Sequence, residues 1–325
     1  MRRSERKFGA VQAVAITGLC LAGIVAGAWV VAGGDGPGEC VGCGTARCAR
    51  SALWGSACES AAESPTASRI RSAIERGRRY FGTHVDVADP SWISLFGYMR
   101  RRFGFEVSLA SGEKAHAVRG DTARPEMFEV FRRIDDPDAA IAKQTIADLP
   151  HVIDRITASA LHCDRIDLPD DWIEILGKAS RAGGYALTHA LLASEWSVEN
   201  GCVRRERLAA LRSEQIGLLV ALVERRDELA STYPSVTDLW IEAVVMLYYA
   251  GAADAVQPDW IREILTLQHA DGGWPRNPSV PRSDAHVSAL ALWALLENDR
   301  VPLRTPWIEP AVGPDSRTEK GRNAR

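Results

Sequence analysis

Two histidines each precede a tryptophan by seven residues, and these are the side chains whose spacing best suits chemistry. The pairs are His189 with Trp196 and His286 with Trp293. Seven residues are nearly two helical turns, so within a helix each histidine shares a face with its tryptophan. Such an imidazole can bind a metal or a ligand, or it can be a hydrogen-bonded residue of an apolar core. Both interpretations stay open.

Tyr185 lies one turn before His189 and extends the same face. Together these residues are candidates for lining a ligand cavity, although aromatic residues at helical spacing also fill cores. Other site patterns are missing from the sequence. It contains no G-x-S-x-G nucleophile motif, no phosphate-binding Walker loop and no dinucleotide-binding G-x-G-x-x-G. Cys163 beside His162 is a sequence neighbour only, which establishes no catalytic geometry.

Each histidine follows a repeated segment. Residues 169–176 (PDDWIEIL) resemble residues 258–265 (PDWIREIL), and a glycine pair follows at 183–184 in one copy and at 272–273 in the other. The helix that carries the histidine begins after each glycine pair. Repeated helical hairpins of this size predict stacked helix pairs, arranged as a solenoid or as a closed ring.

Helical periodicity extends over most of the chain, and no segment alternates long enough to predict a strand. Prolines at predicted starts and glycines just after predicted ends support the boundaries. We expect an all-α fold with helices near residues 68–81, 91–103, 125–134, 150–161, 170–181, 185–196, 203–230, 236–250, 259–268 and 284–296.

The second copy carries a family resemblance. The string Gln268-x-x-Asp271-Gly272-Gly273-Trp274 and the helix after Asp284 resemble one repeat of the α/α-toroid superfamily. That superfamily includes squalene and other terpene cyclases and the protein prenyltransferases, and the resemblance is clear over residues 258–297. It implies repeated helical hairpins forming a toroid, complete or partial, in which the string ties neighbouring helices together.

The resemblance also has implications for the histidines and for metal binding. In a toroid the second helix of each pair lines the inner barrel, so His189 and His286 are expected to point inward. Similarity to the prenyltransferases implies zinc ligands at Asp284 and His286, with His189 as a third and one open position. The sequence departs from that pattern, because His286 replaces a cysteine and no later histidine follows it.

Cyclase chemistry is not supported by the acidic motifs. The string at residues 135–138 lacks the D-x-D-D spacing, and Ala139 stands where D-D-x-x-D needs its last aspartate. The acidic string at residues 167–171 does not fit either. Both strings are typical of acids near helix N-termini. Carbocation cyclisation is therefore not expected.

The N-terminus predicts a membrane anchor. Residues 1–7 contain Arg2, Arg3, Arg6 and Lys7, and residues 8–34 form an uncharged apolar run. The length suits one transmembrane signal anchor, and the flanking charges predict a cytoplasmic N-terminus with the main domain outside the cell membrane. A cleaved signal peptide is the alternative, and it would leave the compartment unchanged.

Outside the predicted span the chain has six cysteines, an even number. Residues 35–66 form a Cys-rich stalk containing Cys40, Cys43, Cys48 and Cys58, for which disulfides, a zinc knuckle or free thiols stay open. Cys163 and Cys202 are expected to pair with each other in an oxidising compartment.

The remaining boundaries place a toroid-like domain at residues 67–297 and a disordered tail at residues 298–325. The formal net charge of -3 gives no reason to expect nucleic acid as a partner. The chain is thus interpreted as a membrane-anchored extracytoplasmic domain that binds a protein, peptide or lipid without catalysis. The alternative is a cavity enzyme at His189 and His286, metal-assisted or not. No cofactor is expected unless the zinc site forms.

Overall fold

A computed structural model describes residues 65–86, 89–115, 125–134, 136–299 and 307–308, all within one compact unit that spans Ala61–Arg325. The described residues form helices and two isolated β-bridges, so the all-α prediction is confirmed. The helices are α1 (Pro65–His84), α2 (Pro90–Phe103), α3 (Pro125–Phe131), α4 (Lys143–Ala147), α5 (Val152–Leu161), α6 (Trp172–Ala182), α7 (Gly184–Glu199), α8 (Arg205–Glu224), α9 (Arg226–Ala230), α10 (Val236–Tyr249), α11 (Pro258–Thr266) and α12 (Ala285–Asp299), with 3-10 turns η2 (Arg132–Ile134) and η3 (Ala253–Ala255).

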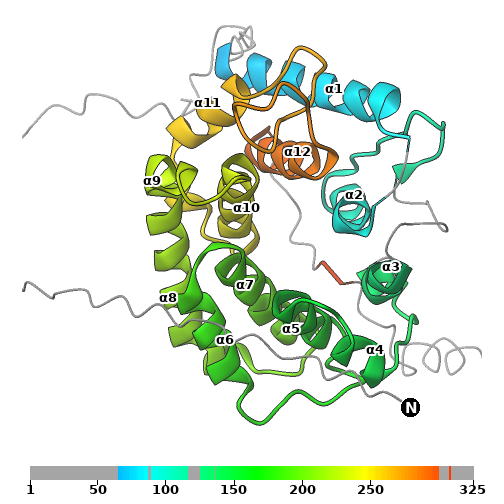
Figure 1. Ribbon diagram of the computed structural model, residues 1–325, viewed down its shortest axis with the longest axis vertical. Coiled ribbons are helices and arrows are strands. Elements are labelled where there is room, and N and C mark those ends of the chain that lie inside the picture. Colours follow the sequence, from blue (N-terminus) through cyan, green and yellow to red (C-terminus); the bar gives the residue numbers. More distant parts are fainter. Residues whose placement is uncertain (1–64, 87–88, 116–124, 135, 300–306, 309–325) are drawn as a thin grey trace, which may run out of the picture. The chain divides into compact units, whose positions relative to one another are not determined.

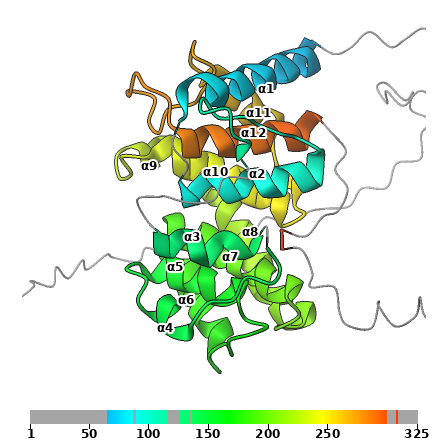
Figure 2. The same ribbon diagram turned by 90° about the vertical axis from the view of Figure 1, so that its right-hand side faces the viewer.

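The helices of this unit pack in a ring (Figure 1). Following the ring, α2 packs on α3, α3 on α5, α5 on α7, α7 on α10 and α10 on α12, and α12 packs back on α2. We call these the inner helices. Helices α1, α6, α8 and α11 pack on the outer side of this ring, and Figure 2 shows the same helices from the side.

Composition explains which helices take the inner positions. In α10 every residue from Val236 to Tyr248 is buried, and α12 is buried from Val287 to Leu296. A helix that is apolar around its whole circumference must be covered on all sides. The outer helices α6 and α11 instead bury one apolar stripe, which includes Leu176 in α6 and Ile264 in α11.

The first and last helix pairs meet through close packing at Gly77 of α1. A Cβ added there would lie 2.8 Å from Cδ2 of Leu292 on α12 and 3.0 Å from Cζ3 of Trp274. Glycine therefore allows α1 to approach α12 closely. The fully buried Trp274 ring fills the junction, and its Nε1 donates to the carbonyl of Ile264 on α11 at 2.7 Å.

Gln268 links the same junction by hydrogen bonds. Its Nε2 donates to the carbonyl oxygens of Ala73 in α1, at 2.9 Å, and of Gly272, at 2.8 Å. The Arg76 guanidinium donates to its Oε1. Gly272 has φ +94°, and a Cβ there would lie 2.3 Å from the carbonyl oxygen of Arg76, so only glycine fits.

Asp271 completes the turn between α11 and α12. Its Oδ1 accepts hydrogen bonds from the backbone N–H of Gly273 at 2.9 Å and from the hydroxyl of Ser283 at 2.8 Å. The motif string at residues 268–274 thus joins α11, α12 and α1 through its side chains. This string lies on the outer side of the ring, and its role there is structural.

Several predicted boundaries need correction. The predicted helix at 203–230 breaks at Arg225 into α8 and α9, and the short α4 was not expected. Residues 65–66, placed in the stalk, begin α1, while residues 298–299, placed in the disordered tail, end α12. Trp307 and Ile308 of that tail are buried, because they pack against aromatic residues of the ring.

The predicted membrane anchor at residues 8–34 and the cysteines of the stalk lie outside the described residues. Within the described part of the chain, no helix is both long and apolar enough to be a candidate membrane span.

The expected Cys163–Cys202 disulfide is confirmed. Cys163 follows α5 and Cys202 follows α7, and their Cα atoms lie 6.0 Å apart. The bond ties together the ends of two adjacent inner helices, across a sequence separation of 39 residues.

Replacing both Cys163 and Cys202 by Ala should lower the free energy of unfolding by about 2–4 kcal/mol, because the cross-link restricts the unfolded chain. Urea denaturation of the oxidised protein and of the double variant measures the difference. Equal stability of the two proteins, or alkylation of both thiols in native protein, would contradict the prediction.

Gln268→Met should lower the free energy of unfolding by about 1–3 kcal/mol, because it leaves the Arg76 guanidinium and two carbonyl groups without their side-chain partner. The matched control is Gln257→Met, since Gln257 is exposed and its side chain makes no hydrogen bond among those described. The control should change stability by less than about 0.5 kcal/mol. An equal effect of both changes in thermal denaturation would rule out the linking role of Gln268.

Candidate functional site

The inner helices enclose a cavity of about 380 Å³. Side chains from α2, α3, α5, α7, α10 and α12 line it, together with Arg276 from the loop before α12 and Trp307 from beyond that helix. The volume lies within the range of small-molecule sites in proteins, roughly 300–1,000 Å³.

Three inner helices contribute side chains in the same order along the chain. In α7 and α12 the lining runs from polar through aliphatic to aromatic residues, and in α10 it runs from a polar to an apolar residue. The cavity-lining residues in this order are Tyr185, His189, Leu192 and Trp196 on α7, Glu242 and Met246 on α10, and His286, Leu290 and Trp293 on α12. Because their polar residues meet at one end and their aromatic residues at the other, these helices run parallel.

The two ends of the cavity differ in exposure. At the polar end the side chain of Arg276 is 49% exposed, His189 24% and His286 21%. At the aromatic end Trp196 is 1% exposed and Trp293 0%. The polar end is therefore the mouth, and the aromatic end is the closed floor.

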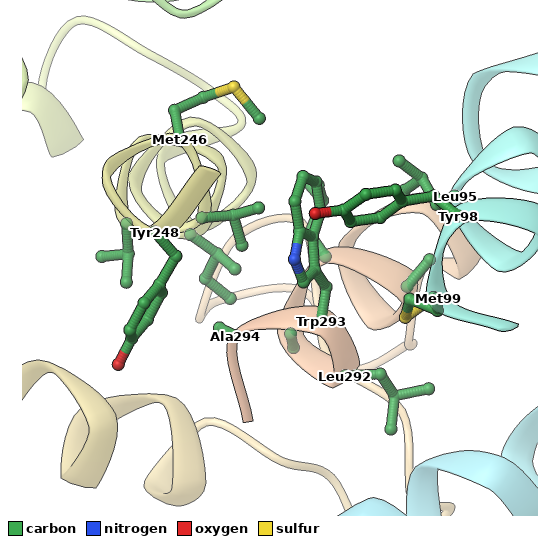
Figure 3. Close-up of a cluster of buried hydrophobic side chains, with 14 of the residues drawn as sticks. Leu95, Tyr98, Met99, Met246, Tyr248, Leu292, Trp293 and Ala294 are labelled. Carbon is green, nitrogen blue, oxygen red and sulfur yellow. The ribbon is translucent and has the colours of Figure 1, made fainter. Parts of the chain in front are cut away.

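Trp307 completes the floor. Its ring centroid lies 5.3 Å from that of Trp196 and 5.1 Å from that of Trp293, in edge-to-face geometry. The backbone N–H of Trp307 donates to Oε2 of half-buried Glu199 at 3.1 Å, and Arg101 donates to the carbonyl oxygen of Trp307. Figure 3 shows Trp293 of α12 beside Tyr98 of α2 in this part of the core. The ring centroids of these two residues lie 5.0 Å apart.

At the mouth, Asp238 of α10 and His286 of α12 form an ion pair, with Nδ1 of His286 3.0 Å from Oδ1 of Asp238. The hydroxyl of Tyr185 donates to the other oxygen, Oδ2, at 2.8 Å. Burial works against charge on the imidazole, but the carboxylates, Asp238 above all, overcome it and raise the pKa of His286 to about 9. Burial also disfavours the Asp238 anion, yet His286 and the Tyr185 hydrogen bond leave its pKa below the usual value.

Beside this pair lie His189 of α7 and Glu242 of α10, with Nε2 3.7 Å from Oε1. Burial raises the pKa of Glu242 to about 7, and the neighbouring Asp238 charge adds to that shift. Burial and the positive charge of His286 lower the pKa of His189 to about 4. At neutral pH His189 is uncharged and Glu242 is divided between its acid and its anion.

The two histidines differ from a core histidine in the same fold. His162 is fully buried, and its Nε2 lies 2.9 Å from the carbonyl oxygen of Val130. By contrast, His189 and His286 line the cavity and reach carboxylates of α10. Among the residues that the structure describes, Nδ1 of His189 has no hydrogen-bond partner.

Asp284 lies apart from the cavity lining. Its Oδ1 accepts from the backbone N–H of Val287 at 3.1 Å at the start of α12, and its Oδ2 lies 3.2 Å from Nε of Arg276. Among the described residues no group of three His, Cys, Asp or Glu side chains is arranged to hold a metal ion. The geometry therefore gives no support to a zinc set of Asp284, His286 and His189.

Sequence reasoning missed Asp238, Glu242, Arg276 and Trp307. A signal for the two acids was available, because they stand four residues apart, on one face, in a helix that is otherwise almost entirely apolar. Acids at such positions need a partner or a solvated cavity. Arg276 and Trp307 lie outside helices and had no comparable pattern.

Comparison with known protein-family models, curated proteins and solved structures finds no match to the chain. The assignment of a function therefore depends on the cavity itself.

His286 should titrate near pH 9 and His189 near pH 4 in imidazole NMR spectra. Because the folded-state pKa of His286 exceeds its ordinary value of 6.5, protonated His286 stabilises the fold below pH 6.5. That contribution is lost as the pH rises through about 9. In Asp238→Asn the pKa of His286 should fall to its ordinary value or below, because the carboxylate charge that offsets the effect of burial on the imidazole is removed.

The control is Asp254→Asn, since Asp254 is exposed in η3. It should leave the His286 titration where it is in the wild type. The ion pair would be refuted if His286 titrates near pH 6.5 in the wild type, or if Asp238→Asn leaves the pKa of His286 unchanged.

Proposed function

We propose that this chain is a membrane-anchored, extracytoplasmic α/α-toroid-like domain that binds an amphipathic, lipid-like molecule in its central cavity without catalysis. The ligand enters with its apolar part first. The apolar part contacts Trp196, Trp293 and Trp307, and the polar part stays at the mouth with His189 and His286. The observation that carries this proposal is the cavity's division into a titratable mouth and an aromatic floor.

The order of the helices supports the toroid. Along the chain, outer helices α1, α6, α8 and α11 each precede an inner helix, namely α2, α7, α10 and α12. The last inner helix packs on the first pair. Such alternation is what the proposed relationship to the cyclase and prenyltransferase superfamily requires, and the string at residues 268–274 lies at the expected turn.

The Cys163–Cys202 disulfide supports an extracytoplasmic location, because structural disulfides persist in oxidising compartments. The anchor at residues 8–34 would hold the domain at the cell membrane, where lipids or lipid-bearing peptides are the nearest apolar ligands. The anchor itself rests on the sequence.

A cavity enzyme is the second candidate. Titratable side chains with shifted pKa values converge at the mouth, and such groupings are frequent in active sites. In an enzyme, Glu242 and His189 would exchange a proton with the substrate beside the His286–Asp238 ion pair. Mass spectrometry of a ligand recovered after incubation would distinguish the candidates, since an enzyme alters the ligand and a binding protein returns it unchanged.

Binding is tested with 1-octanol, an uncharged amphiphile, by isothermal titration calorimetry on the full-length chain. Wild-type protein should bind it with a dissociation constant in the sub-millimolar range. Leu192→Trp should abolish binding while leaving the thermal midpoint nearly unchanged, because the indole extends into the cavity between mouth and floor and not into packed side chains.

The matched control is Val280→Trp, which places the same ring on an exposed loop residue outside the cavity lining. It should bind octanol as the wild type does. Wild-type protein that fails to bind octanol, or a Leu192→Trp variant that binds it normally, would overturn the proposed function.

A further inference from the structure

Glu242 differs in its partners from Glu195 and Glu297, which pair with arginines. It also differs from Glu199, which accepts hydrogen bonds from the Tyr249 hydroxyl and the backbone N–H of Trp307. Glu195 is 5% exposed and forms salt bridges with two arginines, Arg205 and Arg212. The side chain of Glu297 is 3% exposed and pairs with Arg102 at 2.8 Å. A buried carboxylate is costly unless a cation or several hydrogen bonds compensate it, and these pairs provide that compensation.

Glu242 is 7% exposed and faces the cavity. Among the described residues, its one basic neighbour in ion-pairing range is His189, at 3.7 Å, and Thr188 hydrogen-bonds it. His189 carries no charge at neutral pH, because burial and His286 lower its pKa to about 4. The fold thus places an acid at the cavity wall with no arginine or lysine in ion-pairing range among the described residues. The charge of His286 lowers the pKa of Glu242 from a longer distance, but its ion pair is with Asp238.

The surrounding charges already have partners. On α12, His286 pairs with Asp238, and in the preceding loop Arg276 pairs with Asp284. On α7, Tyr185 donates to Asp238. Asp154 of α5 adds a further carboxylate to the cavity lining. Helices α8 and α9 cover another face of α10, where Arg226 stacks on Trp240. Two residues correspond to about 200° around a helix, so Trp240 and Glu242 point in nearly opposite directions.

We propose that the ligand of this cavity carries a cationic amine, which pairs with Glu242, and an apolar chain, which extends to the tryptophan floor. This inference rests on the proposed function and specifies its ligand class. His189 and Trp196 are separated by seven residues, which corresponds to about 10 Å along the helix axis. The apolar chain therefore spans about that length.

Without a bound amine, Glu242 can be neutralised by a proton instead of by the charge of the ligand. Burial raises the pKa of Glu242 to about 7, so the carboxyl is mostly protonated at pH 6 and mostly ionised at pH 8. An alkylamine, like a lysine side chain, stays protonated at both values. Its affinity should therefore rise as Glu242 ionises.

The experiment compares octylamine, 1-octanol and octanoate, which share one chain length, by calorimetry at pH 6 and pH 8 and constant salt. Octylamine should bind most tightly at pH 8, and its affinity should increase about tenfold between the two values, following the ionised fraction of Glu242. Octanol should bind more weakly and with little dependence on pH. Octanoate should bind least well at pH 8.

Glu242→Gln should remove the pH dependence and weaken octylamine at least about tenfold at pH 8, which equals about 1.4 kcal/mol. The circular dichroism spectrum and the thermal midpoint of Glu242→Gln should match those of the wild type, which shows that the variant remains folded. The matched control is Glu206→Gln, because Glu206 is exposed on α8 and lies outside the cavity lining.

The outcomes separate the two proposals. If octanol does not bind, the proposed function fails, and the amine assignment that rests on it fails as well. If octanol or octanoate binds as tightly as octylamine at pH 8, the cavity binds amphiphiles and the amine assignment is overturned. The same conclusion follows if Glu242→Gln retains the pH dependence of octylamine binding.

Discussion

The close approach of α1 to α12 is the contact on which the rest of this structure depends. Gly77 brings the helices together, Trp274 fills the junction, and Gln268 hydrogen-bonds the carbonyl of Ala73. These contacts join distant parts of the sequence, since Gln268 and Ala73 are separated by 195 positions. Without this closure, the apolar helix α12 would lose its cover on one side, and a row of helix pairs would have exposed ends.

Closure also determines what the cavity can contain. Parallel inner helices place equivalent positions at equal heights, so a repeated sequence order becomes a layered cavity. His189 and His286 then lie in one layer, and Trp196 and Trp293 lie in another. Trp307 seals the aromatic layer, because its ring packs edge-to-face on both tryptophans. The amphipathic character of the cavity thus follows from register within the ring.

The sequence predicted the helices best where proline and glycine mark their ends. Helix α7 begins at Gly184 and α11 begins at Pro258, within a residue of expectation. The break at Arg225 carries no such residue, so one long helix was predicted there. Residues placed by repeat spacing, such as His189 and His286, could be assigned to one face in advance. The spacing of Glu242 from Asp238 indicated its face, but not its partner His189, which is brought near by the approach of α7. Trp307 had no sequence signal, because its place depends on packing against Tyr98, Tyr249 and Trp293.

Stability alone does not account for the polar mouth. Burial raises the pKa of Glu242 from its ordinary value of 4.5 to about 7. The free energy of unfolding therefore decreases as the pH rises through this range, because ionised Glu242 is less favourable in the folded state. Apolar residues of similar volume in place of a buried ionic cluster are frequently neutral or stabilising. The chain already uses such residues at the next layer, where Leu192, Met246 and Leu290 line the cavity. The mouth therefore keeps carboxylates and imidazoles where aliphatic side chains would pack at lower cost. A ligand that compensates them is the simplest physical reason for their presence.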